Sequence, residues 1–217
     1  MEDSFVGVNG KMTEEERIFS GMLFAPEEPE LIEKKLKAHM LSQEYSLSPE
    51  EQSEKRNQIL KELLAEIGEG TFMIGPIRFH YGCHTKIGAH CFMNFNFTVQ
   101  DDTWVTIGDH NSFGPNVTIV TPMHPMLGEE RRGMVCSDGV ERSLCYAKPV
   151  TIGNDCWFGA NVVVCPGVTI SDNCVIGAGS VVTRDIPSGS FAAGVPARVI
   201  RQITEKDSIR NIFETIR

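Results

Sequence analysis

The chain has 217 residues, of which 41% are hydrophobic and 23% charged, which suits one sizeable folded domain and excludes a disordered chain. Its formal net charge of −9 argues against a nucleic-acid-binding protein, because phosphate contacts need clustered Lys and Arg. No stretch approaches the roughly 20 apolar residues of a membrane span, and residues 1–11, which we expect to be flexible, contain no apolar signal core, so we expect a cytoplasmic protein.

The seven cysteines are scattered along the chain without a C-x-x-C pair. An odd number with no secretory signal fits reduced thiols better than disulfides. We expect Cys156, Cys165 and Cys174, which lie in strand-like runs, to act as small apolar fillers.

The first half of the chain is predicted to contain a helical segment at residues 12–70. Thr13 precedes three glutamates and resembles an N-cap, with acidic residues where the helix dipole favours them. A later helix is expected from Pro49 to Ile67, where apolar residues recur at helical spacing and Gly70 follows.

After Gly70 the apolar residues change their period to six. The six-residue series is Ile152, Phe158, Val164, Ile170, Ile176 and Val182, and the upstream series is Ile87, Met93 and Val99 followed, after a slip of two residues, by Ile107, Phe113 and Ile119. A period of six fits neither a helix nor simple strand alternation.

A fixed six-residue period predicts a parallel β-helix over residues 71–200, in which each hexapeptide forms one face of a triangular coil. Three faces give a coil of about 18 residues, and coils stack at roughly 4.8 Å. A β-sandwich with chance spacing is the alternative, and the unbroken run of matches argues against it. The fold class is therefore mainly β, with residues 201–217 as a C-terminal segment.

The period breaks at residues 120–149, so this stretch must leave the coil as an extended loop. Long loops on a regular scaffold tend to carry function. This loop contains the sequence Thr121-Pro122-Met123-His124-Pro125.

The chain resembles the galactoside and maltose O-acetyltransferases of the hexapeptide-repeat acyltransferases between about Glu14 and Arg201. The motifs that carry this resemblance are ERI-x-x-G-x-LF (Glu16 to Phe24), YG…IG…NFN…DD (Tyr81 to Asp102), TPMHP, KPVTIG…W-x-G, PGVTI, VIGAGSVVT and AAGVPARVI. The resemblance implies a left-handed coil, against the usual right-handed crossover rule. It also implies acetyl-CoA as co-substrate, no required metal, and a homotrimer.

Acetyl transfer to a hydroxyl needs a base and a group that holds the acceptor. A histidine of ordinary pKa near ~6.5 can serve as the base at neutral pH, and His124 matches the family's catalytic histidine. Asn94 matches the asparagine that holds the acceptor hydroxyl. Its alternative role is that of a corner asparagine of the coil, which we also expect for Asn96.

The resemblance places further residues around the acceptor. Asp102 matches an acceptor-binding carboxylate, and Lys35 falls where the family carries a basic residue, although a solvated surface charge is the alternative. Three residues differ from the sugar-acetylating relatives: His80 replaces a serine, Phe92 a tyrosine and Pro26 an aspartate. The loop at 134–144 also looks longer than theirs, so the chemistry transfers from the family more securely than the acceptor does.

For the cofactor, Ala160 and Ala178 lie 18 residues apart and hence one coil apart on one face. Two stacked small residues leave a shallow groove with exposed backbone N–H groups, and corner packing is the alternative. The resemblance places acyl-CoA there, with the N–H of Ala160 as oxyanion donor. The remaining residues that it implies for acyl-CoA binding are Trp157, Thr183, Arg184 and Arg201, where arginines suit phosphates.

Other functions remain open. Transfer to an amine, as in related antibiotic and amino-sugar acetyltransferases, is the main alternative. A zinc hydratase of the γ-carbonic anhydrase type needs an H-x4-H pair, which the six histidines do not form. A non-catalytic scaffold is disfavoured because His124 and Asn94 are both present.

Overall fold

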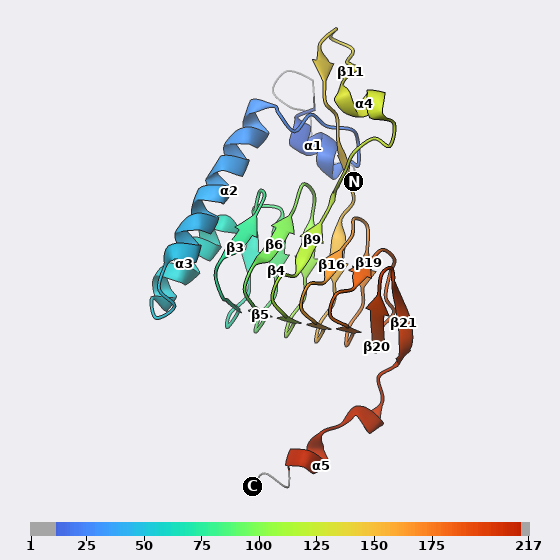
Figure 1. Cartoon of the computed structure of the whole chain (residues 1–217). Coiled ribbons are helices and arrows are strands. Elements are labelled where there is room, and N and C mark those ends of the chain that lie inside the picture. Colours follow the sequence, from blue (N-terminus) through green and yellow to red (C-terminus); the bar gives the residue numbers. More distant parts are fainter. Residues whose placement is uncertain (1–11, 214–217) are drawn as a thin grey trace, which may run out of the picture.

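The computed structural model describes residues 12–213, so the expected flexible N-terminus at residues 1–11 lies outside the described residues. Three helices come first: α1 (Glu14–Phe19), α2 (Pro29–Leu47) and α3 (Ser53–Leu63). Thr13 caps α1 as predicted, in a capping box with Glu16 that satisfies two backbone N–H groups. In Figure 1, α2 and α3 lie side by side at one end of the β domain.

The helical segment ends earlier than predicted. Ile67, which we expected in the third helix, lies instead in β1 (Glu66–Ile67), after α3 has ended at Leu63. β1 pairs in parallel with β4 (Thr85–Ile87), so the β-helix begins at Glu66 rather than at 71. The apolar residue at 67 satisfies the helical spacing of α3 and the inward position of a coil equally well, which is why the sequence pattern misplaced the boundary.

The β domain is a three-sided prism with a sheet on each side (Figure 1). Sheet 1 consists of β1, β4, β7 (Val105–Ile107), β14 (Val150–Ile152) and β17 (Thr169–Ile170). Sheet 2 consists of β2 (Phe72–Met73), β5 (Phe92–Met93), β8 (Ser112–Phe113), β15 (Trp157–Phe158), β18 (Val175–Ile176), β20 (Ser190–Gly194) and β21 (Ala197–Gln202). Sheet 3 consists of β3 (Ile77–Phe79), β6 (Phe97–Gln100), β9 (Thr118–Val120), β16 (Val163–Val164) and β19 (Val181–Val182).

The chain visits sheets 1, 2 and 3 in turn in each coil, and consecutive coils pair in parallel. We call the edges of the prism the 1–2, 2–3 and 3–1 corners. Thr151 pairs with Thr169, 18 residues later, as predicted for a three-hexapeptide coil. Lys86 pairs with Thr106, 20 residues later. The earlier coils are thus two residues longer, which explains the slip in the hexapeptide period.

The predicted inward positions form the core of the prism. All twelve residues of the two six-residue series are at most 2% exposed. The two phenylalanines among them, Phe113 and Phe158, stack from one coil to the next, with ring centroids 4.6 Å apart at an interplanar angle of 12°. Cys156 and Cys174 are buried as expected for apolar fillers, while Cys165 is half-buried.

The 2–3 corner is built by a ladder of asparagines. Asn96, Asn116 and Asn161 have φ values of 60°, 60° and 59°, and their side-chain amides are joined by hydrogen bonds of 2.9 and 3.0 Å. Asparagine tolerates this left-handed conformation better than most residues. Asn96 therefore has the corner role that we expected for it.

The extended loop leaves the prism at the 3–1 corner, between β9 and β14, as predicted. It contains β10 (Pro122–Met123), α4 (Gly128–Arg132), β11 (Met134–Val135), β12 (Glu141–Arg142) and β13 (Tyr146–Ala147). β10 pairs with β13, and β11 pairs with β12, both antiparallel. The loop extends beyond the prism beside α1 (Figure 1).

The far end of the prism is closed by β20 and β21, which pair antiparallel. A 3-10 helix, η1 (Glu205–Asp207), and the short α5 (Arg210–Phe213) follow and extend away from the domain (Figure 1). Among the described helices, none combines the length and the apolar character that crossing a membrane requires.

A buried arginine joins the helices to the first coil. Arg56 is 3% exposed, donates hydrogen bonds to the backbone carbonyls of Ser48 at 2.7 Å and Met73 at 2.6 Å, and stacks over the Tyr45 ring at 4.0 Å. The Arg56 side chain, which belongs to α3, therefore contacts both the end of α2 and β2. Removing it leaves the Ser48 carbonyl without this donor, whereas the Met73 carbonyl keeps the hydrogen bond that it accepts from the Tyr45 hydroxyl at 2.8 Å.

We expect Arg56→Ala to lower the free energy of unfolding by about 3 kcal/mol, because truncating a buried, hydrogen-bonded charge also strands its partners. Urea unfolding followed by circular dichroism measures this change. Lys55→Ala is the matched control, since Lys55 pairs with Glu44 at the surface with both side chains 51% exposed, and such pairs contribute roughly 0–1 kcal/mol. Equal losses in the two variants would contradict this role of Arg56.

Candidate active site

His124 lies directly after β10, at the base of the extended loop. Its side chain is exposed, while the following Pro125 is buried. The ring makes one hydrogen-bond contact with the rest of residues 12–213, between Nδ1 and the Cys145 Sγ at 3.3 Å. The loop therefore presents an imidazole with one nitrogen anchored and the rest of the ring open to solvent.

The residues predicted for the acceptor gather mainly at the 3–1 corner. His80 follows β3 in the first coil, and Asp102 follows β6 in the second. The extended loop with His124 leaves the same corner in the third coil. Lys35 on α2 lies close enough to His80 and Asp102 for its charge to lower the pKa of both.

Burial is the main influence on the charge states of His80 and Asp102. Burial, and then the charge of Lys35 and His39, lower the pKa of His80 to about 4, so this imidazole is neutral at pH 7. Burial and the neighbouring Asp101 carboxylate raise the pKa of Asp102 to about 7. The Oδ2 atom of Asp102 is buried and has no hydrogen-bond partner among the described residues, so this corner offers an unsatisfied polar group to a ligand.

Asn94 lies at the other functional corner, the 2–3 corner, directly after β5. Its Oδ1 accepts a hydrogen bond from the backbone N–H of Phe95 at 2.8 Å, which orients the side chain and leaves the amide NH₂ available. Phe92, from β5, stands on the outward side of sheet 2 and is 36% exposed. Trp157 pairs with Ser112 in the same column of sheet 2 and is 58% exposed.

Ala160 and Ala178 follow β15 and β18 at the 2–3 corner, one above the other. In the part of the chain that the structure describes, the backbone N–H groups of both residues make no hydrogen bond, whereas those of their neighbours Gly159 and Gly177 pair with the next coil. A Cβ at Gly159 would lie 2.5 Å from the Ala178 backbone nitrogen. Glycine at 159 thus permits the close stacking that brings the two free N–H groups into one column.

The other residues predicted to bind acyl-CoA are placed elsewhere. Thr183 and Arg184 follow β19 at the 3–1 corner and are exposed. Arg201, on β21, makes two hydrogen bonds of 2.7 and 2.8 Å to the Asp207 carboxylate. This ion pair already satisfies much of its guanidinium group.

A single chain does not bring its candidate catalytic residues together. His124 belongs to the 3–1 corner and Asn94 to the 2–3 corner, and the width of sheet 3 lies between these corners. The predicted acyl-CoA residues divide in the same way, with Ala160 and Ala178 at one corner and Thr183 at the other.

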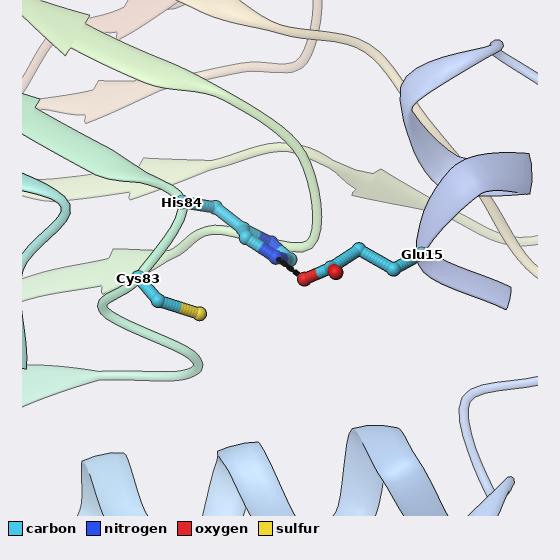
Figure 2. Close-up of side chains that lie close together, drawn as sticks. All are labelled: Glu15, Cys83 and His84. Carbon is cyan, nitrogen blue, oxygen red and sulfur yellow. Dashed lines mark hydrogen bonds and ion pairs between the residues drawn. The ribbon is translucent and has the colours of Figure 1, made fainter. Parts of the chain in front are cut away.

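Sequence reasoning missed an ion pair that fastens α1 to the first coils. The buried His84 ring contacts the Asp101 backbone carbonyl through Nδ1 at 3.0 Å. Through Nε2 it contacts the Glu15 carboxylate at 2.9 Å, as Figure 2 shows. Lys34 pairs with the same Glu15 oxygen. Burial lowers the pKa of His84, but its hydrogen bonds with Cys83 and Glu15 outweigh burial and raise the pKa to about 10. Glu15 and His84 are 69 residues apart, so no local pattern reveals their contact.

The donor atoms of Glu15, Cys83 and His84 lie within 4.8 Å of one another, close enough to hold a metal ion (Figure 2). The Glu15 oxygen, however, already accepts from His84 and Lys34. The hydrogen bond with His84 lowers the pKa of Glu15 to about 2. The cluster is therefore electrostatically satisfied as an ion pair.

Comparison with known proteins gives similarities over most of the chain. The family model described as maltose acetyltransferase hexapeptide capping motif matches residues 17–68, and the hexapeptide repeat of succinyl-transferase matches residues 149–184. The galactoside O-acetyltransferase of Escherichia coli (strain K12) is 44% identical over 200 residues, which cover 92% of this chain and 93% of the relative.

Two solved structures are similar along nearly the whole chain. A galactoside acetyltransferase in complex with coenzyme A has a TM-score of 0.82 at 44% identity and covers 91% of this chain and 94% of its own. A maltose O-acetyltransferase from Clostridium difficile 630 also has a TM-score of 0.82, at 36% identity, and covers 89% of this chain and 99% of its own.

The prism and its extended loop are thus those of a hexapeptide-repeat acyltransferase, a left-handed parallel β-helix enzyme. Within that class, the chain belongs to the maltose and galactoside O-acetyltransferase family.

The Glu15–His84 pair predicts a bell-shaped contribution to stability. The Glu15 pKa is lowered, so its contribution is present above its ordinary value of 4.5 and is lost as the pH falls toward 2. The His84 pKa is raised, so its contribution is present below 6.5 and is lost as the pH rises through about 10. We expect Glu15→Gln to lower the melting temperature most at pH 5–6, by roughly 2–4 °C per kcal/mol lost, and least at pH 9–10.

Calorimetry of wild type and variant across this pH range measures the difference. Glu66→Gln serves as control, because Glu66 meets Lys86 at 3.8 Å on the surface, with side chains 68% and 46% exposed. A difference between wild type and Glu15→Gln that does not change with pH would contradict the ionic character of the pair.

Proposed function

We propose that this enzyme transfers the acetyl group of acetyl-CoA directly to a hydroxyl of a sugar or glycoside, with His124 as general base. The observation that carries the proposal is the similarity, along 91% of the chain, to a galactoside acetyltransferase structure that holds coenzyme A. The exposed imidazole of His124, anchored at Nδ1 beside the acceptor corner, supports the role of base.

Acetyl-CoA supplies an activated thioester when bound. His124 takes the proton from the acceptor hydroxyl while the hydroxyl oxygen forms the new ester bond to the acetyl carbon. As the carbon–sulfur bond of the thioester breaks, His124 returns a proton to the departing thiolate. The free N–H of Ala160 donates a hydrogen bond to the carbonyl oxygen as negative charge develops there. Asn94, whose amide NH₂ is available, holds the hydroxyl oxygen. The last two roles need polar groups that are free to bind a ligand. The backbone N–H of Ala160 makes no hydrogen bond among the described residues, and the Asn94 side chain uses only its Oδ1 in the contact with Phe95.

The 2–3 corner suits the pantetheine arm of the cofactor. The stacked N–H groups of Ala160 and Ala178 match its amide carbonyls, and their small side chains leave the corner open. The exposed Trp157 provides an apolar surface beside them. Arg184, exposed and without an ion pair among residues 12–213, suits the nucleotide phosphates better than Arg201, which is paired with Asp207.

The acceptor side favours a polyhydroxylated molecule. Neutral His80 and the buried Asp102, with a pKa of about 7, each act as hydrogen-bond donor or acceptor without demanding a charged ligand. Lys35 adds a donor from α2. Of the residues that differ from the sugar-acetylating relatives, we assign His80 and Pro26 to this side, whereas Phe92 lies on sheet 2. These differences leave the particular sugar open.

We also propose a homotrimer whose sites lie between subunits. The 3–1 corner carries His124 and the 2–3 corner carries Asn94, so docking one corner against the other across copies completes the site. Such a heterologous contact closes into a ring when it repeats around an axis. Aromatic side chains lie on the outward side of sheet 2, whereas the outward side of sheet 1 carries polar residues. Sheet 1 is therefore the side that we expect to face solvent in the trimer. The outward residues of sheet 1 are Glu66, Lys86, Thr106, Thr151 and Thr169.

Acetyl-CoA consumption with a galactoside, maltose, glucosamine and a simple primary amine tests the acceptor class. We expect sugar hydroxyls to give the highest kcat/KM, with maltose-like sugars above galactosides, because a missing carboxylate at Pro26 costs one hydrogen bond, about 1 kcal/mol. An amine that exceeded every sugar tenfold would replace O-acetylation by N-acetylation.

Mixing two inactive variants tests the composite site. His124→Ala should lower kcat by roughly 10²–10⁴-fold, as for loss of a general base, and Asn94→Ala should also be strongly impaired. Coexpressed in equal amounts, they should recover about one quarter of wild-type activity, because about three quarters of randomly assembled trimers are mixed and each mixed trimer with head-to-tail contacts rebuilds one of its three sites. Absence of recovery, in trimers shown by mass spectrometry to be mixed, would place both residues in one subunit's site.

A further inference from the structure

Cys145 is a residue that the family motifs do not single out. Cys145 immediately precedes β13 in the returning arm of the extended loop. Its Sγ lies 3.3 Å from the Nδ1 of His124. No other side chain in the described part of the chain makes a polar contact with this ring, so the orientation of the imidazole depends on the thiol.

Cys145 is held rigidly, whereas His124 is exposed. The residue is 3% exposed, and its backbone N–H and C=O both pair with those of Phe24 at 2.9 Å. Phe24 is itself fully buried. The thiol is therefore fixed to the segment after α1 as well as to its own loop, and it transmits that fixed position to the ring.

We propose that Cys145 is a positioning residue for the general base: its sulfur accepts the Nδ1–H of His124 and leaves Nε2 free to take the acceptor proton. This inference rests on the proposed function of His124. In the opposite tautomer the S–H donates to Nδ1, and Nε2 carries a proton and cannot act as a base. A thiol can accept or donate a hydrogen bond, and general-base catalysis by Nε2 requires the arrangement in which the sulfur accepts the Nδ1–H.

The groups around the sulfur keep it a neutral thiol. Tyr81, Asp102 and Glu27 face Cys145, and burial followed by the Asp102 and Glu27 carboxylates raises the pKa of the thiol to about 11. The partner of His124 therefore carries no charge at neutral pH. A carboxylate at 145 would instead stabilise the imidazolium and raise the pKa of His124.

Three substitutions at 145 test this role, with maltose as acceptor and acetyl-CoA as donor. Cys145→Ala should lower kcat about 3–10-fold, the loss expected for one hydrogen bond, with KM for acetyl-CoA unchanged. Cys145→Ser should recover part of that loss. Cys145→Asp should move the acid limb of the kcat/KM profile up by about one pH unit, and NMR titration of the His124 imidazole should show the same rise without any turnover.

Cys136→Ser is the matched control, since Cys136 is a half-buried thiol of the same loop that contacts the Met134 carbonyl; its kcat and pH profile should equal wild type. Unchanged kcat in Cys145→Ala together with an unchanged His124 pKa in Cys145→Asp would overturn the proposal. His124→Ala, measured alongside, separates the two claims: retained activity there removes His124 as base, whereas its loss with unaffected Cys145 variants removes only the positioning role.

Discussion

Vertical stacking of the coils is the constraint on which the rest of the structure depends. Parallel backbone hydrogen bonds join each coil to the next, so a residue at one position must fit directly under its counterpart one coil later. In the core this places Phe113 against Phe158. At the 2–3 corner it aligns the asparagines that turn the chain, and beside them the free N–H groups of Ala160 and Ala178. One repeating contact thus produces both the stable interior and a regular row of donors.

The two corners that carry the candidate residues divide the proposed chemistry between them. Sheet 3 separates them, so a single prism carries each half of the proposed site without completing it. The groups left unsatisfied in one chain, Asp102 Oδ2 at one corner and the N–H of Ala160 at the other, are consistent with surfaces that await a ligand or a second copy. Buried polar atoms without partners are uncommon in folded proteins, and Asp102 Oδ2 is one of three such side-chain atoms among the described residues.

The repeat made most of the fold predictable. The six-residue period identified inward residues such as Ile152 and Phe158, and the 18-residue spacing of Ala160 and Ala178 predicted that these two residues stack. The boundary at Glu66 was not predictable, because Ile67 fits a helix and a coil equally. The partners of His84 and His124 were also out of reach. Glu15 lies on α1 and Cys145 in the returning arm of the extended loop, and the positions of these two segments follow no period.

The extended loop leaves and rejoins the prism at a corner, and the strands on either side of it still pair in register, Thr106 with Thr151 and Thr118 with Val163. The insertion therefore costs the scaffold no ladder hydrogen bonds, and loop closure adds little with increasing length. Scaffold and loop are free to diverge at different rates. An engineer who exchanged residues 126–144 for a segment of another length, keeping His124 and Cys145, would alter the proposed acceptor side while keeping the stacked coils that form the proposed cofactor groove.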